Sequence, residues 1–570
     1  MLFTFSLFFY FSFIFFFLSF ILFLSSIYFI LYNKIYIIEW VIFNINSCDI
    51  LIPFIFDKYS LLFRSVVFFI SANVFLFSNY YMYSEYYIKR FTYLVVCFIL
   101  SIIFLIYIPH IVGLLLGWDG LGLTSFLLVV YYQNSKSLGA GILTAIINRI
   151  GDIFLLLSIG WSIFQGHWII LFIWNNFHSF FIIFRITLAG ITKRAQLPFS
   201  RWLPAAIAAP TPVRALVHSS TLVTAGVFLL IRFYPYLRNL KIFNFFILFI
   251  STLTIFIAGF SALFECDIKK IVALSTLSQL GVIIASIGLG LVDLAFFHLI
   301  THALFKALLF VCVGKLIHLH HHSQDLRSMG NLFNQLPFTL ACLNIANLSL
   351  CGIPFLSGFY SKDLIIEISI YNFNNLFILF FFILATIITS SYSVRLSITG
   401  LFSMDINITA QYTEDSNKDS FISILFLSLG GIFVGCLINW VFIIPFSDPF
   451  ISNFIKLSIF FLIVFSGGIT YIIVILNNSF SYFFYYIRSI SSLIFFIVPS
   501  RTQIILKFPL ILGIYSSNIV DGGWSEKIRA IGVFTVFRGI FNGLQVNQGV
   551  IVIPYLSFIF FLIFLWFFII

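Results

Sequence analysis

The feature that most constrains this chain is the recurrence of apolar runs, each about 20 residues long, from one end of the sequence to the other. A helix of that length rises about 30 Å, which is the thickness of the hydrocarbon core of a membrane. A membrane β-barrel would instead need segments of about 10 residues with alternating polarity, and the sequence has none. Only 9% of the residues are charged, against about 25% in a soluble protein. We therefore expect an all-α polytopic membrane protein.

The same runs predict the layout of the chain. We expect about 15 membrane-spanning helices, at 3–32, 59–81, 91–108, 109–131, 142–163, 179–197, 213–234, 243–263, 268–290, 293–316, 336–370, 372–402, 421–443, 454–476 and 550–570. Between 480 and 548, apolar, polar and charged side chains are mixed, which favours an amphipathic segment lying along the membrane or along other helices. The expected regions are an N-terminal transmembrane region (1–90), a core (91–410), further core helices (411–480), a lateral amphipathic region (481–548) and a final span (549–570).

Two of the expected spans are interrupted by proline and glycine. One meets LPFSRWLPAAIAAPTPV at 197–213, and the other contains CGIPFLSGFYSKDLI at 351–365. Proline removes a backbone donor and clashes with the preceding turn, and irregular backbone at membrane depth is tolerated only where protein or water satisfies it. A pair of broken helices indicates an inverted-repeat transporter with its ion sites at the breaks. The two sequence halves are not visibly similar, so the repeat itself is a hypothesis.

Several other functions are disfavoured by composition. The formal net charge of +11 does not indicate a nucleic-acid partner, because in membrane proteins an excess of Lys and Arg usually lies in loops and sets topology. The seven cysteines are scattered without a CxxC pair, which indicates neither a disulfide framework nor an iron–sulfur site. The tract HLHHH at 318–322 is typical of metal binding, but it occupies a short loop after a helix, and we favour an ordinary solvated loop.

Ionisable side chains inside the apolar runs are the candidate functional residues. Each costs at least about 2.5–3.5 kcal/mol at the bilayer centre, so such groups normally face the bundle interior and mark ion pathways. The candidates are Asp119, Arg149, Asp152, Lys193, His218, Lys269, His298, His302, Lys306, Lys362 and Asp363. Structural alternatives exist for some of them. Arg149 and Asp152 are spaced to pair locally, Lys193 could extend to the membrane surface, and His218, alone on its helix, could be a hydrogen-bonded core residue.

His298, His302 and Lys306 form the most informative group. They are spaced four residues apart in HLITHALFK, so on a helix they lie on one face, in a stripe about 12 Å long. Two histidines at this spacing could bind a metal, but no acidic third ligand lies on that face and the lysine would oppose a cation. Because an unperturbed histidine titrates near neutral pH, we favour a proton relay that leads toward Lys362.

Long motifs along the chain carry a family resemblance. LLLGWDGLGLTSFLLVVYYQN, NRIGD, TKRAQLPFSRWLPAAIAAPTPVRALVHSSTLVTAGVFLLIRF, ECDIKKIVALSTLSQLG, HLITHALFKALLF and GIPFLSGFYSKDLIIE together resemble the chain 5 family of mitochondrial NADH:ubiquinone oxidoreductase (respiratory complex I), in its invertebrate form. The resemblance is dense from 38 to 402 and thinner afterwards, where DGGWSE matches. Related antiporter-like subunits and the multisubunit cation/proton antiporters share only parts of these motifs.

The resemblance implies a proton-pumping subunit of the membrane arm in the mitochondrial inner membrane, with two inverted antiporter-like repeats, a lateral helix and a final span. It implies that Asp119 pairs with the broken-helix lysine Lys193. It implies a central hydrophilic axis for protons, which comprises His218, Lys269, His298, His302, Lys306 and the terminal lysine Lys362. It also implies three supporting ionisable residues, Arg149, Asp152 and Asp363. It further implies that this chain binds no cofactor or metal, and that NADH, FMN, the iron–sulfur clusters and ubiquinone are bound by other subunits. The implied partners are the other membrane-arm subunits, above all the antiporter-like chain 4, together with lipids and protons.

The sequence departs from the family pattern in three respects. A short extra N-terminal helix is missing. Asp119 replaces a residue that is commonly Glu in the family and is one methylene longer. Arg194, Arg201 and Arg214, with Arg64, occupy positions where the family tends to have an uncharged residue such as serine. Many invertebrate mitochondria read AGA and AGG as serine and AUA as methionine, and the chain has only 4 Met. We therefore predict that these arginines are serines in the protein made by the mitochondrion.

Two other functions fit parts of these observations. A stand-alone subunit of a multisubunit cation/proton antiporter would share the broken helices and the buried charges. The lateral segment followed by a final span instead favours an assembled membrane arm. A purely structural scaffold is disfavoured, because charged residues at depth occur on five or more of the expected helices.

Overall fold

The computed structural model describes residues 2–45, 48–163, 179–320, 323–330, 332–371, 376–402, 415, 417–443, 452–475, 497–525, 528–529, 531–549 and 552–569. The chain divides into two units, Met1–Phe495 and Phe496–Ile570, which are described separately. Parts of the predicted segments 372–402, 454–476 and 550–570, and of the lateral region 481–548, lie outside the described residues.

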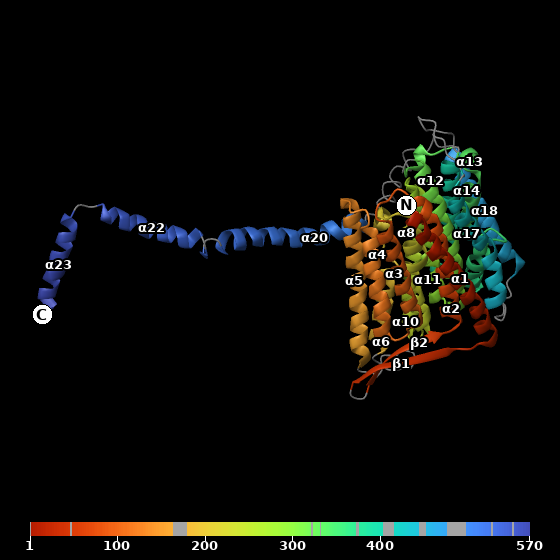
Figure 1. The fold of residues 1–570 in the computed structure, drawn as a ribbon, viewed down its shortest axis with the longest axis horizontal. Coiled ribbons are helices and arrows are strands. Elements are labelled where there is room, and N and C mark those ends of the chain that lie inside the picture. The colour runs from red at the N-terminus through yellow and green to blue at the C-terminus, as the bar shows by residue number, and fades with distance from the viewer. Residues whose placement is uncertain are drawn as a thin grey trace. The chain divides into compact units, whose positions relative to one another are not determined.

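The first unit is a bundle of helices (Figure 1). Its helices are α1 (Leu2–Tyr32), α2 (Lys58–Tyr81), α3 (Ile88–Tyr107), α4 (Ile111–Val129), α5 (Ser135–Ile163), α6 (Ser179–Lys193), α7 (Trp202–Ala205), α8 (Thr211–Leu216), α9 (Leu222–Leu237), α10 (Lys241–Phe264), α11 (Ile268–Gly288), α12 (Val292–Leu319), α13 (Leu332–Gln335), α14 (Pro337–Cys351), α15 (Leu364–Tyr371), α16 (Leu376–Ser397), α17 (Lys418–Ile438) and α18 (Asn453–Ile475). Among the described residues, 11 helices are long and apolar enough to span a membrane. The polytopic helical fold is confirmed, while the total of about 15 spans and the inverted repeat stay predictions.

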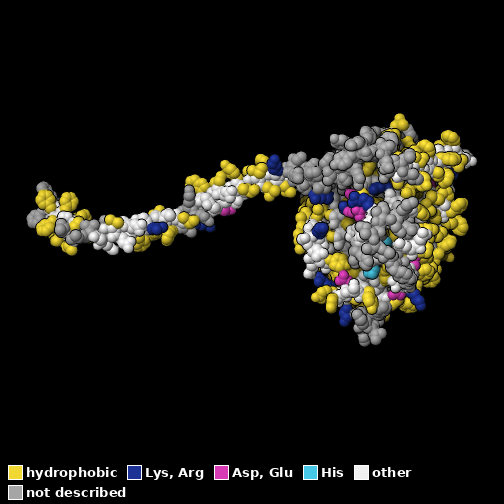
Figure 2. All heavy atoms as spheres, turned by 90° about the horizontal axis from the view of Figure 1, so that it is seen from above, with side chains coloured by type: hydrophobic (Ala, Val, Ile, Leu, Met, Phe, Trp, Pro, Cys, Tyr) yellow, Lys and Arg dark blue, Asp and Glu magenta, His cyan; other side chains and the backbone are white. Residues whose placement is uncertain are grey.

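The outer surface of this bundle is apolar, as expected of a surface that faces lipid. Large hydrophobic side chains such as Phe13, Leu116, Ile153 and Phe461 are exposed. In Figure 2 the hydrophobic side chains cover one whole flank of the bundle. Since scattered apolar side chains are normal on any protein but a continuous apolar belt is not, this surface supports the membrane assignment.

Helices α11 and α12 lie at the centre of the bundle. The most apolar window of each helix is completely buried within the chain, unlike those of α1 and α18, which bury about a fifth. Helix α12 packs against α11, α14 and α17, so its side chains meet protein on every side. The stripe predicted on α12 therefore lies in the interior of the bundle and not on its lipid-facing surface.

One element was not predicted. The strands β1 (Tyr36–Ile45) and β2 (Cys48–Phe56) pair antiparallel as a β-hairpin, with Tyr36 opposite Phe56. The hairpin lies at one end of the bundle (Figure 1) and leads directly into α2. There, Asp57 caps the helix in a reciprocal pair of hydrogen bonds with Ser60, which satisfies backbone groups left open at the first turn.

The two predicted breaks are present. The first follows α6, which ends at Lys193, and the chain then turns through Ala195, whose φ is +55°. The second follows α14, where Gly352 has a φ of +92°. After it the chain re-enters a helix through the π turn η5 (Phe359–Asp363), which carries Lys362. Each break thus places a lysine at the end of a helix in the interior of the bundle.

Within its described residues, the second unit contains the helices α20 (Ile497–Ser516), α22 (Ile531–Gln548) and α23 (Ile553–Ile569) and the π-helical segment η8 (Ser517–Ser525). Many of its large apolar side chains are exposed, and Phe508, Trp524, Phe541 and Phe560 are each 62–70% exposed. A segment with so little internal burial cannot form a core of its own, so its stability depends on surfaces beyond this unit. Its position along a membrane stays a prediction.

Candidate functional site

The stripe on α12 is built as predicted. His298, His302 and Lys306 are each completely buried, and the two imidazole rings lie 6.4 Å apart between centroids. The His298 Nδ1 lies 2.9 Å from the Ser361 hydroxyl, and Ser361 precedes Lys362 in η5. The stripe on α12 therefore contacts η5 at the residue next to the terminal lysine.

Lys306, at the other end of the stripe, contacts α11. Its ammonium group donates a hydrogen bond of 2.6 Å to the Ser275 hydroxyl, and no carboxylate lies within ion-pair distance of it among the described residues. Burying an ammonium group with only a neutral partner is costly, so Lys306 is an unusual side chain for a position that serves packing alone.

Lys362 is enclosed by neutral oxygen atoms. Its ammonium group donates to the Thr389 hydroxyl (2.9 Å) and to the carbonyls of Leu350 (3.2 Å) and Cys351 (3.3 Å). The two carbonyls belong to the last turn of α14, whose free carbonyl groups and helix dipole favour a positive charge. The broken helix therefore creates the binding site for the ammonium group of Lys362.

The residue beside this lysine, Asp363, requires the glycine at the break. A Cβ atom at Gly352 would lie only 2.6 Å from an Asp363 side-chain oxygen, and its φ of +92° disfavours any other residue. The Asp363 carboxyl is 6% exposed. The glycine in the motif CGIPF is thus explained both by backbone conformation and by the space that Asp363 occupies.

Lys193 is held in a different way. Its ammonium group donates 2.8 Å to the backbone carbonyl of Trp118 and lies 3.5 Å from the centre of the Trp118 ring, a cation–π contact. The Trp118 indole in turn donates 2.8 Å to Asp152. Trp118, which the sequence did not single out, therefore connects Lys193 with the carboxylate of Asp152.

The acid–base pair of the NRIGD motif is present. Arg149 lies 3.2 Å from Asp152 and 4.0 Å from Asp119. The side chains of Arg149 and Asp119 are 57% and 42% exposed, whereas that of Asp152 is 11% exposed. The three groups form a chain of charges that runs from the surface of the bundle toward Lys193.

The expected direct pairing of Asp119 with Lys193 is not seen. Lys193 bonds to the carbonyl of the residue that precedes Asp119, and the Asp119 side chain turns to Arg149. The reason is geometric. Asp119 lies on the outer face of α4 and is half-exposed, while Lys193 is completely buried, so the two side chains form no ion pair in this structure, although the charge of Asp119 still acts on Lys193.

The two remaining predicted axis residues lie near the first break. His218 belongs to the π turn η3 (Val217–Thr221), and its side chain lies outside the described residues. Lys269 is buried in the first turn of α11. The like charge of Arg214 acts on it, which makes two cations in one buried region.

Arg194 and Arg214 are unusual in such a place. They are 0% and 1% exposed, and each has two guanidinium nitrogens without a hydrogen-bond partner among the described residues. Arg194 donates 2.7 Å to the carbonyl of Gly226, and Arg214 donates 2.8 Å to that of Ala209. An uncompensated buried charge costs on the order of several kcal/mol. These environments suit a small hydroxyl group better than a guanidinium, which supports the serine prediction. Arg64 differs, because it bonds to Tyr107 and stacks on its ring.

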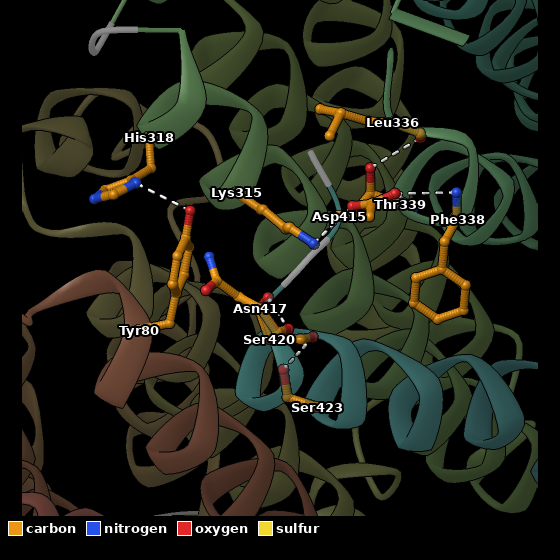
Figure 3. A network of polar contacts seen from close by, with 10 residues as sticks. All are labelled: Tyr80, Lys315, His318, Leu336, Phe338, Thr339, Asp415, Asn417, Ser420 and Ser423. Carbon is orange, nitrogen blue, oxygen red and sulfur yellow. Dashed lines mark hydrogen bonds and ion pairs between the residues drawn. The ribbon is translucent and has the colours of Figure 1, made fainter. Parts of the chain in front are cut away.

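A separate polar network lies at the C-terminal end of α12 (Figure 3). Lys315, completely buried, pairs with Asp415 at 2.7 Å. The other Asp415 oxygen accepts from the amides of Phe338 and Thr339 at the start of α14. Residue 315 is nine positions beyond Lys306, which places it on the opposite side of the helix. This network ties α12 to α14 and is not a continuation of the stripe.

The histidine tract is only partly described. His318 lies 3.1 Å from the Tyr80 hydroxyl, as Figure 3 shows, and His321 and His322 lie outside the described residues. Among the described residues, no group of three or more possible metal ligands is found.

Sequence reasoning missed a set of buried polar side chains, five of them with hydroxyl groups. Helix α11 carries Ser275, Ser278 and Gln279, and α16 carries Thr389, Tyr392 and Ser393, all six buried. Both triplets have the spacing i, i+3, i+4, which places their members on one helix face. Polar residues repeated at this spacing within an apolar span are the signal that could have revealed them.

Comparisons with known proteins assign these features to a family. Residues 40–92 match the family described as NADH-ubiquinone oxidoreductase (complex I), chain 5 N-terminus. Residues 109–389 match NADH:quinone oxidoreductase/Mrp antiporter, TM, and residues 392–570 match NADH dehydrogenase subunit 5 C-terminus.

Whole-chain relatives agree with these matches. The chain is 44% identical over 508 residues to NADH-ubiquinone oxidoreductase chain 5 of Lumbricus terrestris, covering 88% of each chain. It is 45% identical to the protein of that name from Aedes aegypti, covering 87% of each. A solved structure of the Mrp complex from Dietzia sp. DQ12-45-1b has a similar fold, with a TM-score of 0.71 at 22% identity over 96% of this chain and 62% of that one.

Proposed function

The chain belongs to the chain 5 family of NADH-ubiquinone oxidoreductases, and from this premise we propose that its buried ionisable groups form the path by which protons cross the membrane. The chain is a multi-pass, proton-translocating subunit of the enzyme in the mitochondrial inner membrane. It therefore takes part in NADH:ubiquinone reduction as the transport component of the complex.

The observation that carries the proposal is the continuity of buried groups around α12. His298, His302 and Lys306 occupy one face of a completely buried helix, and His298 meets Ser361 next to Lys362. Groups that are costly to bury persist at membrane depth mainly where they carry ions. Four such groups in one connected interior region fit proton transfer better than they fit packing.

In the proposed mechanism, Lys193 gains and loses a proton in response to the charges around it. Its hydrogen bond and its cation–π contact are both made with Trp118. Moving a carboxylate or its arginine partner nearby at low dielectric changes the energy of the lysine charge by several kcal/mol. That is comparable with the ~2.3 kcal/mol needed per charge for each 100 mV of membrane potential.

The path continues from the first break to the second. We assign His218 and Lys269 to its first part and the α12 stripe to its middle, with Lys362 and its neighbour Asp363 at the end. Arg149, Asp119 and Asp152 are the supporting charges that act on Lys193. The structure holds each of these residues, apart from the His218 side chain, inside or at the edge of one bundle.

Electron transfer belongs to other subunits in this proposal. We assign NADH, FMN, the iron–sulfur clusters and ubiquinone to those subunits, and no cofactor or metal to this chain. The partners are other subunits of the membrane arm. The antiporter-like chain 4 is the proposed neighbour at the surface that carries Asp119 and Arg149, because these charges are half-exposed on an otherwise apolar face and a partner there would shield them from lipid.

The alternative of a free-standing antiporter subunit is less well supported. The Mrp complex shares the fold at 22% identity, and such a likeness concerns the fold alone. The C-terminal 392–570 match the family of subunit 5 C-termini, and this region contains the second unit, which lacks a core of its own. A long exposed segment of this kind fits an assembled complex better than an independent carrier.

The experiment is Lys193→Ala in the assembled oxidoreductase, reconstituted in sealed vesicles. We expect proton translocation to be abolished or reduced by on the order of a hundredfold, while the complex still assembles. Quinone reduction in uncoupled vesicles measures assembly and electron transfer independently of pumping. Lys34→Ala is the matched control, since Lys34 is an exposed lysine between α1 and β1. Full pumping by correctly assembled Lys193→Ala would contradict the role.

A further inference from the structure

Two buried polar triplets face each other between α11 and α16. Ser275, Ser278 and Gln279 line one face of α11, and Thr389, Tyr392 and Ser393 line one face of α16. The triplets meet where the Ser278 hydroxyl lies 3.4 Å from the Tyr392 hydroxyl. We call these six residues the hydroxyl seam.

The hydroxyl seam has one lysine at each side. On the α11 side, Lys306 donates 2.6 Å to Ser275. On the α16 side, Lys362 donates 2.9 Å to Thr389. In addition, the Ser393 hydroxyl lies 2.8 Å from the Cys351 thiol, and the carbonyl of Cys351 accepts a second bond from Lys362.

The seam is therefore placed between two groups that exchange protons in the proposed function. Across the two triplets, the Ser278 hydroxyl contacts the Tyr392 hydroxyl, and the Gln279 side chain also interacts with the Tyr392 phenol. Tyr392 is 3% exposed. A buried phenol on the same helix face as Thr389, the partner of Lys362, and in contact with the helix that binds Lys306, has the chemistry of a proton relay, since a hydroxyl group both accepts and donates.

We propose that Tyr392 relays protons between Lys306 and Lys362, with Ser278 as its partner on α11. This inference rests on the proposed function and deepens it. A proton arriving from the Lys306 side binds to a lone pair of the Tyr392 oxygen, and the original phenolic proton leaves toward the Lys362 side. One O–H bond forms and one breaks, so the phenol ends neutral and no charge stays in the seam.

A second route between the same regions is available for comparison. His298 contacts Ser361, and Ser361 also lies 3.0 Å from the Thr301 hydroxyl. This route would deliver protons to Lys362 from the histidine end of the stripe, without the seam. The two routes share Lys362 but no hydroxyl group, so they can be separated by substitution.

The test is Tyr392→Phe in the assembled oxidoreductase, reconstituted in sealed vesicles. Phenylalanine keeps the ring and removes only the hydroxyl, so the packing of α16 is preserved. We expect proton translocation per electron pair to fall on the order of tenfold or more, with quinone reduction in uncoupled vesicles retained. We also expect the ratio of pumping rates in H₂O and D₂O to change, because the relay step is lost. A purely structural role would leave that ratio as it is.

Ser390→Ala is the matched control. Ser390 lies on the same helix, is equally buried, and contacts Ser466 of α18 at 2.5 Å, away from the seam. Its loss should leave pumping and the isotope ratio unchanged. Ser278→Ala should reduce pumping in the same direction as Tyr392→Phe, since it removes the partner hydroxyl.

Two further variants make the outcomes decisive. Lys362→Ala tests the proposed function in the same preparation. If it abolishes pumping while Tyr392→Phe pumps normally with an unchanged isotope ratio, the relay is overturned and the proposed function stands. If Ser361→Ala reduces pumping and Tyr392→Phe does not, the histidine route carries the protons and the seam is again refuted. If Lys362→Ala also pumps normally, the proposed function itself fails.

Discussion

The two broken helices hold their lysines by different means. Lys193 bonds to a single carbonyl and rests on the ring of Trp118, whereas Lys362 is surrounded by two carbonyls and a hydroxyl. The charges that accompany Lys193 extend to the surface through Asp119 and Arg149. The acid beside Lys362, by contrast, is almost completely buried.

This difference indicates that the two lysine sites have different roles. Groups on the surface can be moved or shielded by a neighbouring subunit, so the energy of the Lys193 charge can be changed from outside the chain. Enclosed groups keep a fixed geometry, because protein interiors are close-packed. We infer that the first break responds to events elsewhere in the complex, and that the second break holds and releases a proton in a constant environment.

The largest expected effect concerns the charge beside the first lysine. Arg194 is next to Lys193 and completely buried with unpaired nitrogens, whereas the second lysine is followed by an acid. A guanidinium stays charged at any physiological pH and would permanently repel a proton on Lys193. We therefore expect serine at 194 and 214 in the protein isolated from mitochondria.

Mass spectrometry of peptides that span these positions measures this directly. Each peptide should be lighter by the difference between an arginine and a serine residue. Trypsin should also fail to cleave after 194 and 214, while cleaving after an ordinary arginine such as Arg90. Arginine at both positions would refute the prediction, and the first site would then work beside a fixed positive charge.

The next effect comes from replacing each lysine by arginine. At 193 the flat guanidinium can stack on Trp118, so the complex should assemble. Because a guanidinium does not lose its proton, pumping should fall on the order of a hundredfold. At 362 the larger group must fit among the carbonyls of Leu350 and Cys351 and the hydroxyl of Thr389. Overpacking of that kind costs about 1–3 kcal/mol, so assembly itself should decrease.

Blue native electrophoresis measures assembly, and the pH change in sealed vesicles measures pumping. Glutamine at each position, smaller and neutral, provides the control for charge. If Lys193→Arg disrupts assembly as severely as Lys362→Arg does, the expectation that the Lys193 site accommodates a guanidinium is wrong.

Much of the architecture could be predicted because membrane burial imposes simple rules. The apolar runs indicate the bundle, since each must be long enough to cross the hydrocarbon core. Pro198 and Gly352 indicate the breaks. Proline lacks the backbone N–H that a helix needs, and glycine readily adopts the positive φ that ends one. The stripe on α12 could be predicted for the same reason: helix geometry alone places residues four apart on one face.

The rest depends on contacts that a single sequence does not display. The hairpin of β1 and β2 was missed because its apolar residues are nearly continuous, a pattern that does not distinguish strand from loop or helix. Trp118 connects Lys193 to Asp152 through its backbone carbonyl and its ring, and no motif spacing reveals either. The hydroxyl seam is formed by two helices that are far apart in the sequence. Ser278 and Tyr392 are separated by 114 positions, so the sequence alone does not show that they meet.

The smallest expected effect comes from lengthening each acid by one methylene. Asp119→Glu extends the carboxylate by about 1.5 Å toward Arg149, now 4.0 Å away. A partly exposed ion pair is worth at most about 1 kcal/mol, so pumping should change by no more than about fivefold, with normal assembly. Asp363→Glu makes the same change against Gly352. There the Asp363 oxygen is already so close that a Cβ atom added to the glycine would lie only 2.6 Å from it.

That second variant should therefore lower the yield of assembled complex before it alters pumping. Comparing the two by electrophoresis and by the pH change per electron pair separates an adjustable site from a fixed one. Equal damage from both substitutions would mean that Asp119 is as tightly constrained as Asp363. The regulation of Lys193 would then have to come from inside the chain, through Asp152 and Trp118, because an acid that tolerates no displacement cannot transmit a change from a neighbouring subunit.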